Sequence, residues 1–310
     1  MPPVLRLENV TKRYGQTLAV DGVSFTAEPG RLFGLLGPNG AGKTSTIRMI
    51  AHITAPDAGT ITLGGEPVSP ATQRRMGYLP EERGLYRKML VGEQLVYLAR
   101  LKGRTVHDAE ADARRWLDRL GAAEWFGKRV EELSKGMQQK VQFIATVMHE
   151  PDLVILDEPF SGLDPINADA LQETVAEMRA AGRTVLFASH RMEQVEQLCD
   201  DLCLIANGRV VLAGSLREVR SRFGRDTASI HFDGPDGFLD PLTEAGAVRV
   251  LSRSAHTATL RLGDGADPRD ILRAALDSGA DVDRFEVHAP PLAEIFRQAV
   301  SGEPVPSVPV

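Results

Sequence analysis

The residues with the clearest chemical meaning lie in one glycine-rich stretch. It runs Gly37-Pro38-Asn39-Gly40-Ala41-Gly42-Lys43-Thr44-Ser45 and fits the pattern of glycine, four residues, then Gly-Lys-Ser/Thr. A polyphosphate carries dense negative charge, so its site needs several donors that converge at short range. Glycine has no Cβ, so consecutive backbone N–H groups can turn towards one centre and the ligand can approach closely. The stretch therefore predicts a nucleoside triphosphate site, in which Lys43 reaches the β- and γ-phosphates and the Thr44 hydroxyl ligates Mg²⁺.

Two regular elements must hold this loop in place. Residues 31–36 are expected to form a strand, and residues 46–50 are expected to be helical, with the helix beginning near Lys43. The N-terminal end of that helix is positive, which favours an anion. A chance glycine turn between a strand and a helix is the alternative. The complete order of strand, loop, lysine, threonine and helix argues against it.

A pair of carboxylates follows a second buried strand. Residues 153–156 are aliphatic without alternation, as expected of a parallel strand buried on both faces, and Asp157 and Glu158 come next. Ligands of open α/β sheets lie beyond the carboxyl ends of the strands. Because successive strand residues point to opposite sides, Asp157 could hold the Mg²⁺ shell while Glu158 orients or deprotonates an attacking water. An acidic turn after a strand is the structural alternative.

A histidine takes a matching place after another strand. Residues 184–188 are expected to form that strand, and His190 follows its carboxyl end. The other histidines have no comparable placement and are expected to be structural: His52, His107, His149, His231, His256 and His288. Ahead of this strand, Asp164 and Pro165 suit the N-cap and the first position of a helix over about 168–181.

An aromatic residue precedes the glycine-rich loop. Residues 4–10 and 18–26 alternate in part and suit antiparallel strands, with Tyr14 in the loop between them. The ring could stack on the face of an adenine. A loop tyrosine taken alone is more often part of the surface, so this residue gains meaning only beside the other motifs.

The middle of the chain changes character. Residues 91–149 favour helices, and Thr105 with Asp108 is typical of a helix N-terminus. Gly121 is a suitable C-terminal stop. We expect an all-helical insertion in an α/β domain.

Composition limits the classes of protein. The chain has 310 residues, 43% of them hydrophobic, which is enough for more than one domain. The net charge of -6 disfavours nucleic acid as a partner. The only cysteines, Cys199 and Cys203, are expected to be a reduced, packed pair. No apolar run approaches the roughly 18 residues that span a bilayer, and the start lacks the pattern of a secretory signal. We therefore expect a cytoplasmic protein, peripheral on the inner face of the cell membrane if another chain holds it there.

A second, smaller domain is expected at the C-terminal end. The predicted elements are strand 227–232, helix 236–245, strand 247–251, strand 256–262, helix 268–278 and strand 282–287, with a last helix from Leu292 to Arg297. That β-α-β-β-α-β order indicates an α+β ferredoxin-like module. The predicted domains are residues 1–220, a linker at 221–226, the module at 227–300 and a disordered tail at 301–310. The dipeptide Asn207-Gly208 predicts a type I′ hairpin turn ahead of this boundary.

One further stretch gives these motifs a common meaning. Residues 133–140, Leu-Ser-Lys-Gly-Met-Gln-Gln-Lys, open a helix before the 153–156 strand, and taken alone they are a serine N-cap with a glycine nearby. Together with the other motifs, in this order from about residue 4 to 215, they resemble the signature of ATP-binding cassette (ABC) ATPases. The resemblance implies a P-loop cassette with a mixed sheet core, an antiparallel β subdomain and a helical subdomain. It also implies ATP and Mg²⁺ as ligands and a head-to-tail dimer, in which each ATP lies between one copy's glycine-rich loop and the other copy's Ser134 and Gly136.

The resemblance also implies a role for each matching residue. Tyr14 stacks on adenine, and the stretch from Gly37 to Ser45 binds the phosphates. Asp157 orders the Mg²⁺ shell with Thr44, Glu158 is the general base, His190 contacts the γ-phosphate, and Asp164 communicates across the dimer. Lys43 and Glu81 belong to the catalytic set, Glu81 also as a ligand of the metal.

The sequence departs from the family at three positions. Lys135 and Met137 stand where the signature usually has glycine and glutamine, while Ser134 and Gly136 are kept. Glu81 stands where a glutamine is usual, which adds charge beside Asp157 and Glu158. A carboxylate can still ligate Mg²⁺ or accept a hydrogen bond from water.

Residues 78–86, the signature stretch and the added C-terminal module are similar to one subgroup, the ATPases of two-component bacterial exporters related to sodium-export and drug-resistance pumps. The resemblance implies a separate polytopic permease that selects the cargo. Two alternatives stay open: a soluble, non-transport ABC ATPase that acts on DNA or ribosomes, and an importer ATPase with a regulatory domain.

Overall fold

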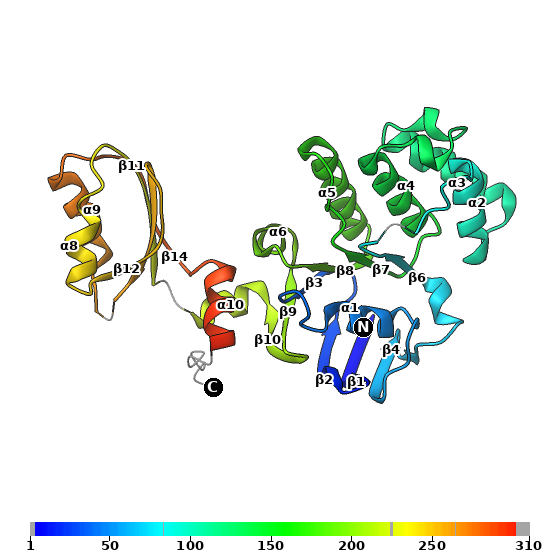
Figure 1. Cartoon of the computed structure of the whole chain (residues 1–310), viewed down its shortest axis with the longest axis horizontal. Coiled ribbons are helices and arrows are strands. Elements are labelled where there is room, and N and C mark those ends of the chain that lie inside the picture. Colours follow the sequence, from blue (N-terminus) through cyan, green and yellow to red (C-terminus); the bar gives the residue numbers. More distant parts are fainter. Residues whose placement is uncertain (1–3, 83, 224–225, 264, 302–310) are drawn as a thin grey trace. The chain divides into compact units, whose positions relative to one another are not determined.

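The computed structural model describes residues 4–82, 84–223, 226–263 and 265–301 (Figure 1). It divides into two compact units, Met1–Leu216 and Arg217–Val310. The division falls earlier than the predicted linker, because α7 (Leu216–Arg222) runs into it with Val219 and Phe223 buried. Ser301 ends the last helix, and the rest of the predicted tail, 302–310, lies outside the described residues. None of the helices in the described residues is both long enough and apolar enough to cross a membrane.

The first unit is built on a six-stranded sheet of order β10-β9-β3-β8-β7-β6. Its strands are β3 (Leu32–Leu36), β6 (Met76–Leu79), β7 (Leu153–Asp157), β8 (Thr184–Ser189), β9 (Asp201–Ala206) and β10 (Arg209–Ser215). All neighbours pair in parallel except β9 and β10. Every residue of β3, β7 and β8 is buried, and for residues 153–156 of β7 the aliphatic run predicted this. Their carboxyl ends therefore meet at one edge of the sheet.

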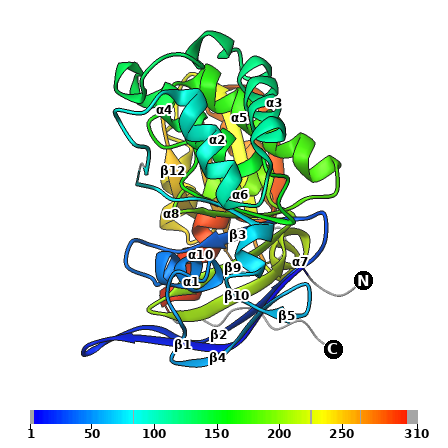
Figure 2. The ribbon, with the colours of Figure 1, turned by 90° about the vertical axis from the view of Figure 1, so that its right-hand side faces the viewer.

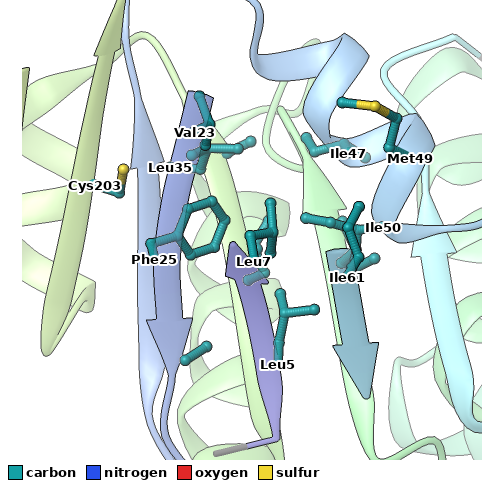
Figure 3. Packing of buried hydrophobic residues seen from close by; sticks show 14 of the residues in the cluster. Leu5, Leu7, Val23, Phe25, Leu35, Ile47, Met49, Ile50, Ile61 and Cys203 are labelled. Atoms are coloured by element: carbon teal, nitrogen blue, oxygen red, sulfur yellow. The ribbon is translucent and has the colours of Figure 1, made fainter. Parts of the chain in front are cut away.

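A second, antiparallel sheet of order β2-β1-β4-β5 packs against this core. Its strands are β1 (Leu5–Tyr14), β2 (Thr17–Ala27), β4 (Ala58–Leu63) and β5 (Glu66–Pro67). Figure 3 shows Leu5, Leu7 and Phe25 from this sheet facing Ile47 and Ile50 of α1 (Lys43–Ile50). Tyr14 does not lie in a loop, as the sequence suggested, but ends β1, where it pairs with Thr17.

The helices that follow in the middle of the unit match the predicted helical insertion and lie above the strands of the six-stranded sheet in the view of Figure 2. They are α2 (Val91–Leu101), α3 (Val106–Arg119) and α4 (Lys135–Val147), with short 3-10 turns at Ala123–Trp125 and Val130–Glu132. Another 3-10 turn, Thr72–Arg75, precedes β6. Thr105 caps α3 by accepting a hydrogen bond from the Asp108 N–H. Ser134 caps α4 by accepting one from the Met137 N–H at 3.3 Å. Both predicted caps are confirmed.

The remaining elements of this unit are α5 (Pro165–Ala180) and α6 (Met192–Leu198). Asp164 caps α5 and Pro165 is its first residue, as predicted. Asn207 and Gly208 have φ values of 50° and 78°, which confirms the type I′ turn between β9 and β10. Cys199 and Cys203 are both free and buried.

The second unit confirms the β-α-β-β-α-β order. Its elements are β11 (Thr227–Asp233), α8 (Leu239–Glu244), β12 (Val248–Arg253), β13 (Thr257–Leu262), α9 (Pro268–Asp277), β14 (Asp281–His288) and α10 (Leu292–Ser301). The antiparallel sheet has the order β12-β13-β11-β14, and α8 and α9 cover one of its faces (Figure 1). On α10, the buried carboxylate of Glu294 forms an ion pair with Nη2 of Arg249, on β12, at 2.8 Å.

Candidate functional site

One cavity of about 340 Å³ lies at the carboxyl ends of β3, β7 and β8. It is lined by Ala19, Asn39, Gly40, Ala41, Gly42, Lys43, Thr44, Ser45, Glu81, Asp157, Glu158 and His190. The fold thus brings the glycine-rich loop together with four predicted residues from the ends of three other strands: Glu81, Asp157, Glu158 and His190. Ala19 also lines the cavity but was not a predicted site residue, because an alanine carries no functional group that indicates such a role.

The glycine-rich loop needs glycine for two close approaches of backbone. Gly37 has φ 152°, and a Cβ there would lie 2.2 Å from the carbonyl oxygen of Ile205. Gly42 has φ 106°, and a Cβ there would lie 2.4 Å from the carbonyl oxygen of Ala19 on β2. Any larger residue at either position would push the loop away from β2 or β9. Gly42 is also the N-cap of α1 and provides no side-chain cap, so the first turn presents its N–H groups to the cavity.

Lys43 is folded back on its own loop. Its Nζ donates to the carbonyl oxygens of Gly37 at 2.7 Å and Pro38 at 3.1 Å, and the side chain is 7% exposed. Burial lowers the pKa of this ammonium, while the carboxylates of Glu158, Asp157 and Glu81 act in the opposite direction. An anion in the cavity would offer Lys43 a better partner than two neutral carbonyls.

The surroundings of Asp157 raise the pKa of its carboxyl. Burial raises its pKa to about 6, with further contributions from the negative charges of Glu81 and Glu158. Lys43 and Arg48 oppose the shift without cancelling it. Asp157 is therefore a carboxylate that lacks enough positive charge nearby, and a cation between Asp157 and Glu81 would relieve this repulsion.

The donor set fits Mg²⁺. Thr44, Asp157 and Glu81 offer side-chain oxygens in the cavity, and oxygen is what this hard cation prefers. Across the described ranges, no three His, Cys, Asp or Glu side chains are grouped to hold a metal by themselves. Mg²⁺ is commonly held by one or two carboxylates together with substrate phosphates, so the site fits an ion that arrives with a nucleotide.

Glu158 is held firmly although it follows the end of β7. Its φ is 49°, in the left-handed region that a residue with a side chain rarely adopts. Its carboxylate accepts hydrogen bonds from Ser189 Oγ at 3.1 Å and from the His190 N–H at 2.8 Å, and His190 Nδ1 lies 2.6 Å away. Ser189 was not among the predicted site residues. The only signal for it was its position directly before His190.

Six predicted residues are not among the described residues that line this cavity: Tyr14, Gly37, Pro38, Ser134, Gly136 and Asp164. Tyr14 is 44% exposed, with Lys12 Nζ at 5.7 Å from the ring centroid. Ser134 and Asp164 cap their own helices, and the hydrogen bonds from Asn167 hold the pKa of Asp164 below its usual value. One chain by itself therefore does not bring the signature to the glycine-rich loop.

Comparison with known proteins agrees with this site. Residues 20–161 match the family model described as ABC transporter, and residues 214–300 match the C-terminal domain of DrrA1-3-like ATP-binding proteins. The chain is 43% identical over 297 residues to the uncharacterized ABC transporter ATP-binding protein YhaQ of Bacillus subtilis, covering 96% of this chain and 98% of that protein.

Two further matches extend the comparison. The Nod factor export ATP-binding protein I of Burkholderia pseudomallei is 40% identical over 233 residues, 74% of this chain and 76% of that protein. A solved ATP-binding subunit of an ABC transporter superposes with a TM-score of 0.67 at 32% identity, over 71% of this chain and 93% of that one. The predicted cassette fold is thereby confirmed. The chain belongs to the ATP-binding subunits of ABC transporters, the ATPases that work in complexes with membrane components, and it carries the C-terminal domain of the DrrA1-3-like members.

Proposed function

We propose that this chain hydrolyses Mg²⁺-ATP in a head-to-tail pair of cassettes and thereby drives export by a separate polytopic permease. One observation carries the proposal: a single cavity joins the loop from Gly40 to Ser45 with Glu81, Asp157, Glu158 and His190. An anion cradle, a cation site and a candidate base are the parts that phosphoryl transfer to water requires.

The phosphates would lie against the first turn of α1. The N–H groups there would receive the phosphate oxygens, and Lys43 would leave the carbonyls of Gly37 and Pro38 to contact the β- and γ-phosphates. Thr44, Asp157 and Glu81 would hold Mg²⁺, which when bound neutralises charge on the phosphates. Tyr14, at the end of β1, would stack on the adenine.

Glu158 would act as the general base on the attacking water. Its two oxygens are fixed by Ser189 and by the backbone and ring of His190, so the carboxylate is oriented before the substrate arrives. His190 would also contact the γ-phosphate. When Glu158 takes a proton from the water, its carboxylate loses its negative charge next to the His190 ring. The hydrogen bond between His190 Nδ1 and Glu158 can adjust to this change.

The second copy would complete each site. The N-terminal end of α4, with Ser134 and Gly136, would face the γ-phosphate bound by the other copy, since neither residue lines the cavity of its own chain. Asp164 would lie in the same interface. Loss of the γ-phosphate would remove this shared contact and let the pair open.

A second surface suits the permease. A cavity of about 280 Å³ lies beside the Glu81 loop, lined among others by Ile53, Leu85, Leu98 and Leu101. Ile53 and Leu101 are 55% and 58% exposed. Tyr86 and Tyr97, the neighbours of Leu85 and Leu98, are also exposed and contact each other edge to face at 6.3 Å. Exposed apolar residues around a cavity are typical of a protein–protein contact. Docking here would place the chain peripherally on the inner face of the membrane.

Export is favoured by the relatives and the domain plan. The matched Nod factor protein is named for export, and a DrrA1-3-like domain follows the cassette. We propose residues 1–220 as the cassette, with its helical subdomain at 91–149, and residues 227–300 as an accessory domain. The cargo would be selected by the permease.

The experiment that tests this function is an affinity purification of the tagged chain from detergent-solubilised membranes of its source, followed by mass spectrometry. We expect a stoichiometric polytopic partner. The matched control is Leu101→Asp with Ile53→Asp, which places charge on the proposed docking surface and leaves the ATP cavity untouched. Recovery with ribosomes, DNA or no partner, equally for both proteins, would instead support a non-transport cassette ATPase.

Glu81→Gln is expected to raise the Mg²⁺ concentration that gives half-maximal ATPase activity by about three- to tenfold. The change removes one negative charge next to Asp157, and an opposite charge within about 4–6 Å of a cation site contributes on the order of 1 kcal/mol. Steady-state ATPase rates at fixed ATP and varied free Mg²⁺ measure this. An unchanged Mg²⁺ curve would show that the Glu81 carboxylate takes no part in holding the ion.

A further inference from the structure

Helix α4 carries two buried glutamines on one side. Gln139 and Gln142 are 2% and 6% exposed, and residues three apart on a helix lie on the same face. Gln139 Nε2 donates to the carbonyl oxygen of Pro159 at 3.0 Å. Gln142 Nε2 donates to the carbonyl oxygens of Pro80 and Glu82, both at 3.3 Å. One helix face is thus bonded to two separate loops.

Those two loops carry the candidate catalytic carboxylates. Pro159 follows Glu158 directly, and Pro80 and Glu82 are the two neighbours of Glu81. The carbonyls that accept from the glutamines are therefore one peptide away from the residues that line the ATP cavity. Glu158 has the left-handed φ of 49°, a conformation that persists only where its surroundings fix it.

The choice of glutamine at these positions is informative. Both are buried on α4, as are Val141, Phe143 and Ile144. Burying an amide is costly unless it is hydrogen-bonded, and its loss would leave carbonyls without partners. The two glutamine amides are therefore best explained by their hydrogen bonds to the carbonyls of the two carboxylate loops.

The N-terminal end of the same helix does not line this cavity. Ser134 caps α4, and Gly136 lies in its first turn, with a Cβ position 3.6 Å from Leu163 Cδ2 in the segment that follows Glu158. From Gly136 to Gln142 the helix rises only about 9 Å. A regular helix of this length moves as one body, so a shift at its N-terminal end is passed to both glutamines.

We propose that Gln139 and Gln142 are positioning residues that couple the two ATP sites of the cassette pair. This rests on the proposed head-to-tail function, in which the N-terminal end of α4 meets the nucleotide held by the other copy. Contact between the N-terminal end of α4 and the other copy's nucleotide fixes the position of α4. The amides of Gln139 and Gln142 then fix the positions of Glu158 and Glu81 in the chain's own cavity. ATP in one site thereby prepares the carboxylates of the other, which makes hydrolysis cooperative in ATP.

The test uses Gln139→Met in the full-length chain, because methionine has a similar length and no donor. The matched control is Gln73→Met: the Gln73 amide also donates to backbone carbonyls, those of Ala51 and His52, but it lies outside the signature stretch and bonds to neither carboxylate loop. ATPase rates are measured over a range of ATP concentrations, nucleotide affinity by titration with a fluorescent ATP analogue, and thermal stability by differential scanning fluorimetry.

For Gln139→Met we expect kcat to fall about tenfold and the Hill coefficient for ATP to approach one, with nucleotide affinity and thermal stability like those of Gln73→Met. Tenfold corresponds to about 1.4 kcal/mol, close to the net worth of one buried hydrogen bond. A merely structural role would change stability and not the Hill coefficient. Gln142→Met makes the same test at the Glu81 loop, should Gln139→Met fail to fold.

The outcomes separate this coupling from the proposed function. If the wild type is cooperative and Gln139→Met and Gln142→Met keep its kcat and Hill coefficient, the coupling is wrong and the cassette pair stands. If the wild type itself has a Hill coefficient of one and remains monomeric with Mg²⁺-ATP, the head-to-tail pair fails, and the coupling fails with it.

Discussion

Glu158→Gln is expected to lower kcat for ATP hydrolysis at least about 100-fold while ATP still binds. General base catalysis contributes about 10²–10⁴ in rate, and an amide cannot take the proton from water. The replacement is isosteric, so one amide oxygen can still accept from the His190 N–H, which now lies 2.8 Å from the carboxylate. None of the phosphate-loop groups changes. Steady-state ATPase assays and equilibrium nucleotide binding measure the two effects separately.

The same variant also tests the cassette pair. With Mg²⁺-ATP present and hydrolysis blocked, we expect light scattering to give the mass of a dimer. Glu8→Gln is a suitable control, since Glu8 is an exposed residue of β1 that pairs with Arg6. A Glu158→Gln protein that stays monomeric with bound Mg²⁺-ATP would contradict the head-to-tail arrangement, and one that hydrolyses ATP at the wild-type rate would remove Glu158 from the role of base.

Asp157→Asn is expected to stabilise the nucleotide-free protein at pH 7–8 by on the order of 2 kcal/mol while abolishing ATPase activity. Burial and the neighbouring Glu81 and Glu158 raise the pKa of Asp157 from 3.8 to about 6. A raised carboxyl pKa means that the folded state holds the ionised group less well than the unfolded state does. Stability is therefore lost as the pH rises from about 4 to 6, and the variant avoids this loss. This electrostatic penalty in the nucleotide-free protein is expected of a site whose carboxylates are arranged to bind a cation.

Urea unfolding in EDTA without nucleotide measures this effect. Both tryptophans, Trp116 and Trp125, lie in the first unit, so their fluorescence reports on it. The advantage of Asp157→Asn should disappear by about pH 4. Equal stability of variant and wild type at pH 7–8 would show that Asp157 carries no such penalty.

A buried histidine makes folding stability depend on pH in the opposite direction. Burial lowers the pKa of His149 from 6.5 to about 4, and its Nε2 lies 3.1 Å from the Met76 carbonyl. Between pH 6.5 and 4 the unfolded chain binds the proton and the folded chain does not, so this residue lowers stability as the pH falls. In the wild type the Asp157 and His149 contributions oppose each other. Asp157→Asn leaves the histidine unopposed and should lose stability more steeply on acidification.

The parts of the protein that the sequence predicted well are those whose cause is local. Gly42 and Lys43 mark the end of a strand and the start of a helix within a few residues, and Asn207-Gly208 requires two positive φ angles in succession. Thr105 and Asp164 cap helices through groups three residues away. Such features depend on short-range sterics and hydrogen bonds, which the order of residue types already specifies.

The boundary between the units illustrates the reverse case. The charged and glycine-containing stretch at 221–226 has the composition of a linker, but Val219 and Phe223 give α7 a buried side that extends it to Arg222. Tyr14 likewise ends a strand because its partner Thr17 lies across the hairpin. Burial in the first case and strand pairing in the second override the local pattern.

The sequence by itself determined that this chain is a nucleotide-binding α/β protein with a phosphate loop, a carboxylate pair, a histidine after a strand and a small α+β module. Only the tertiary structure decided how the site is held: Ser189 on Glu158, Lys43 on the loop carbonyls, Ala19 at the wall, and Gln139 and Gln142 on the two carboxylate loops. The physical reason is distance along the chain. These contacts join residues that are far apart in sequence or depend on a buried environment, so no local spacing encodes them.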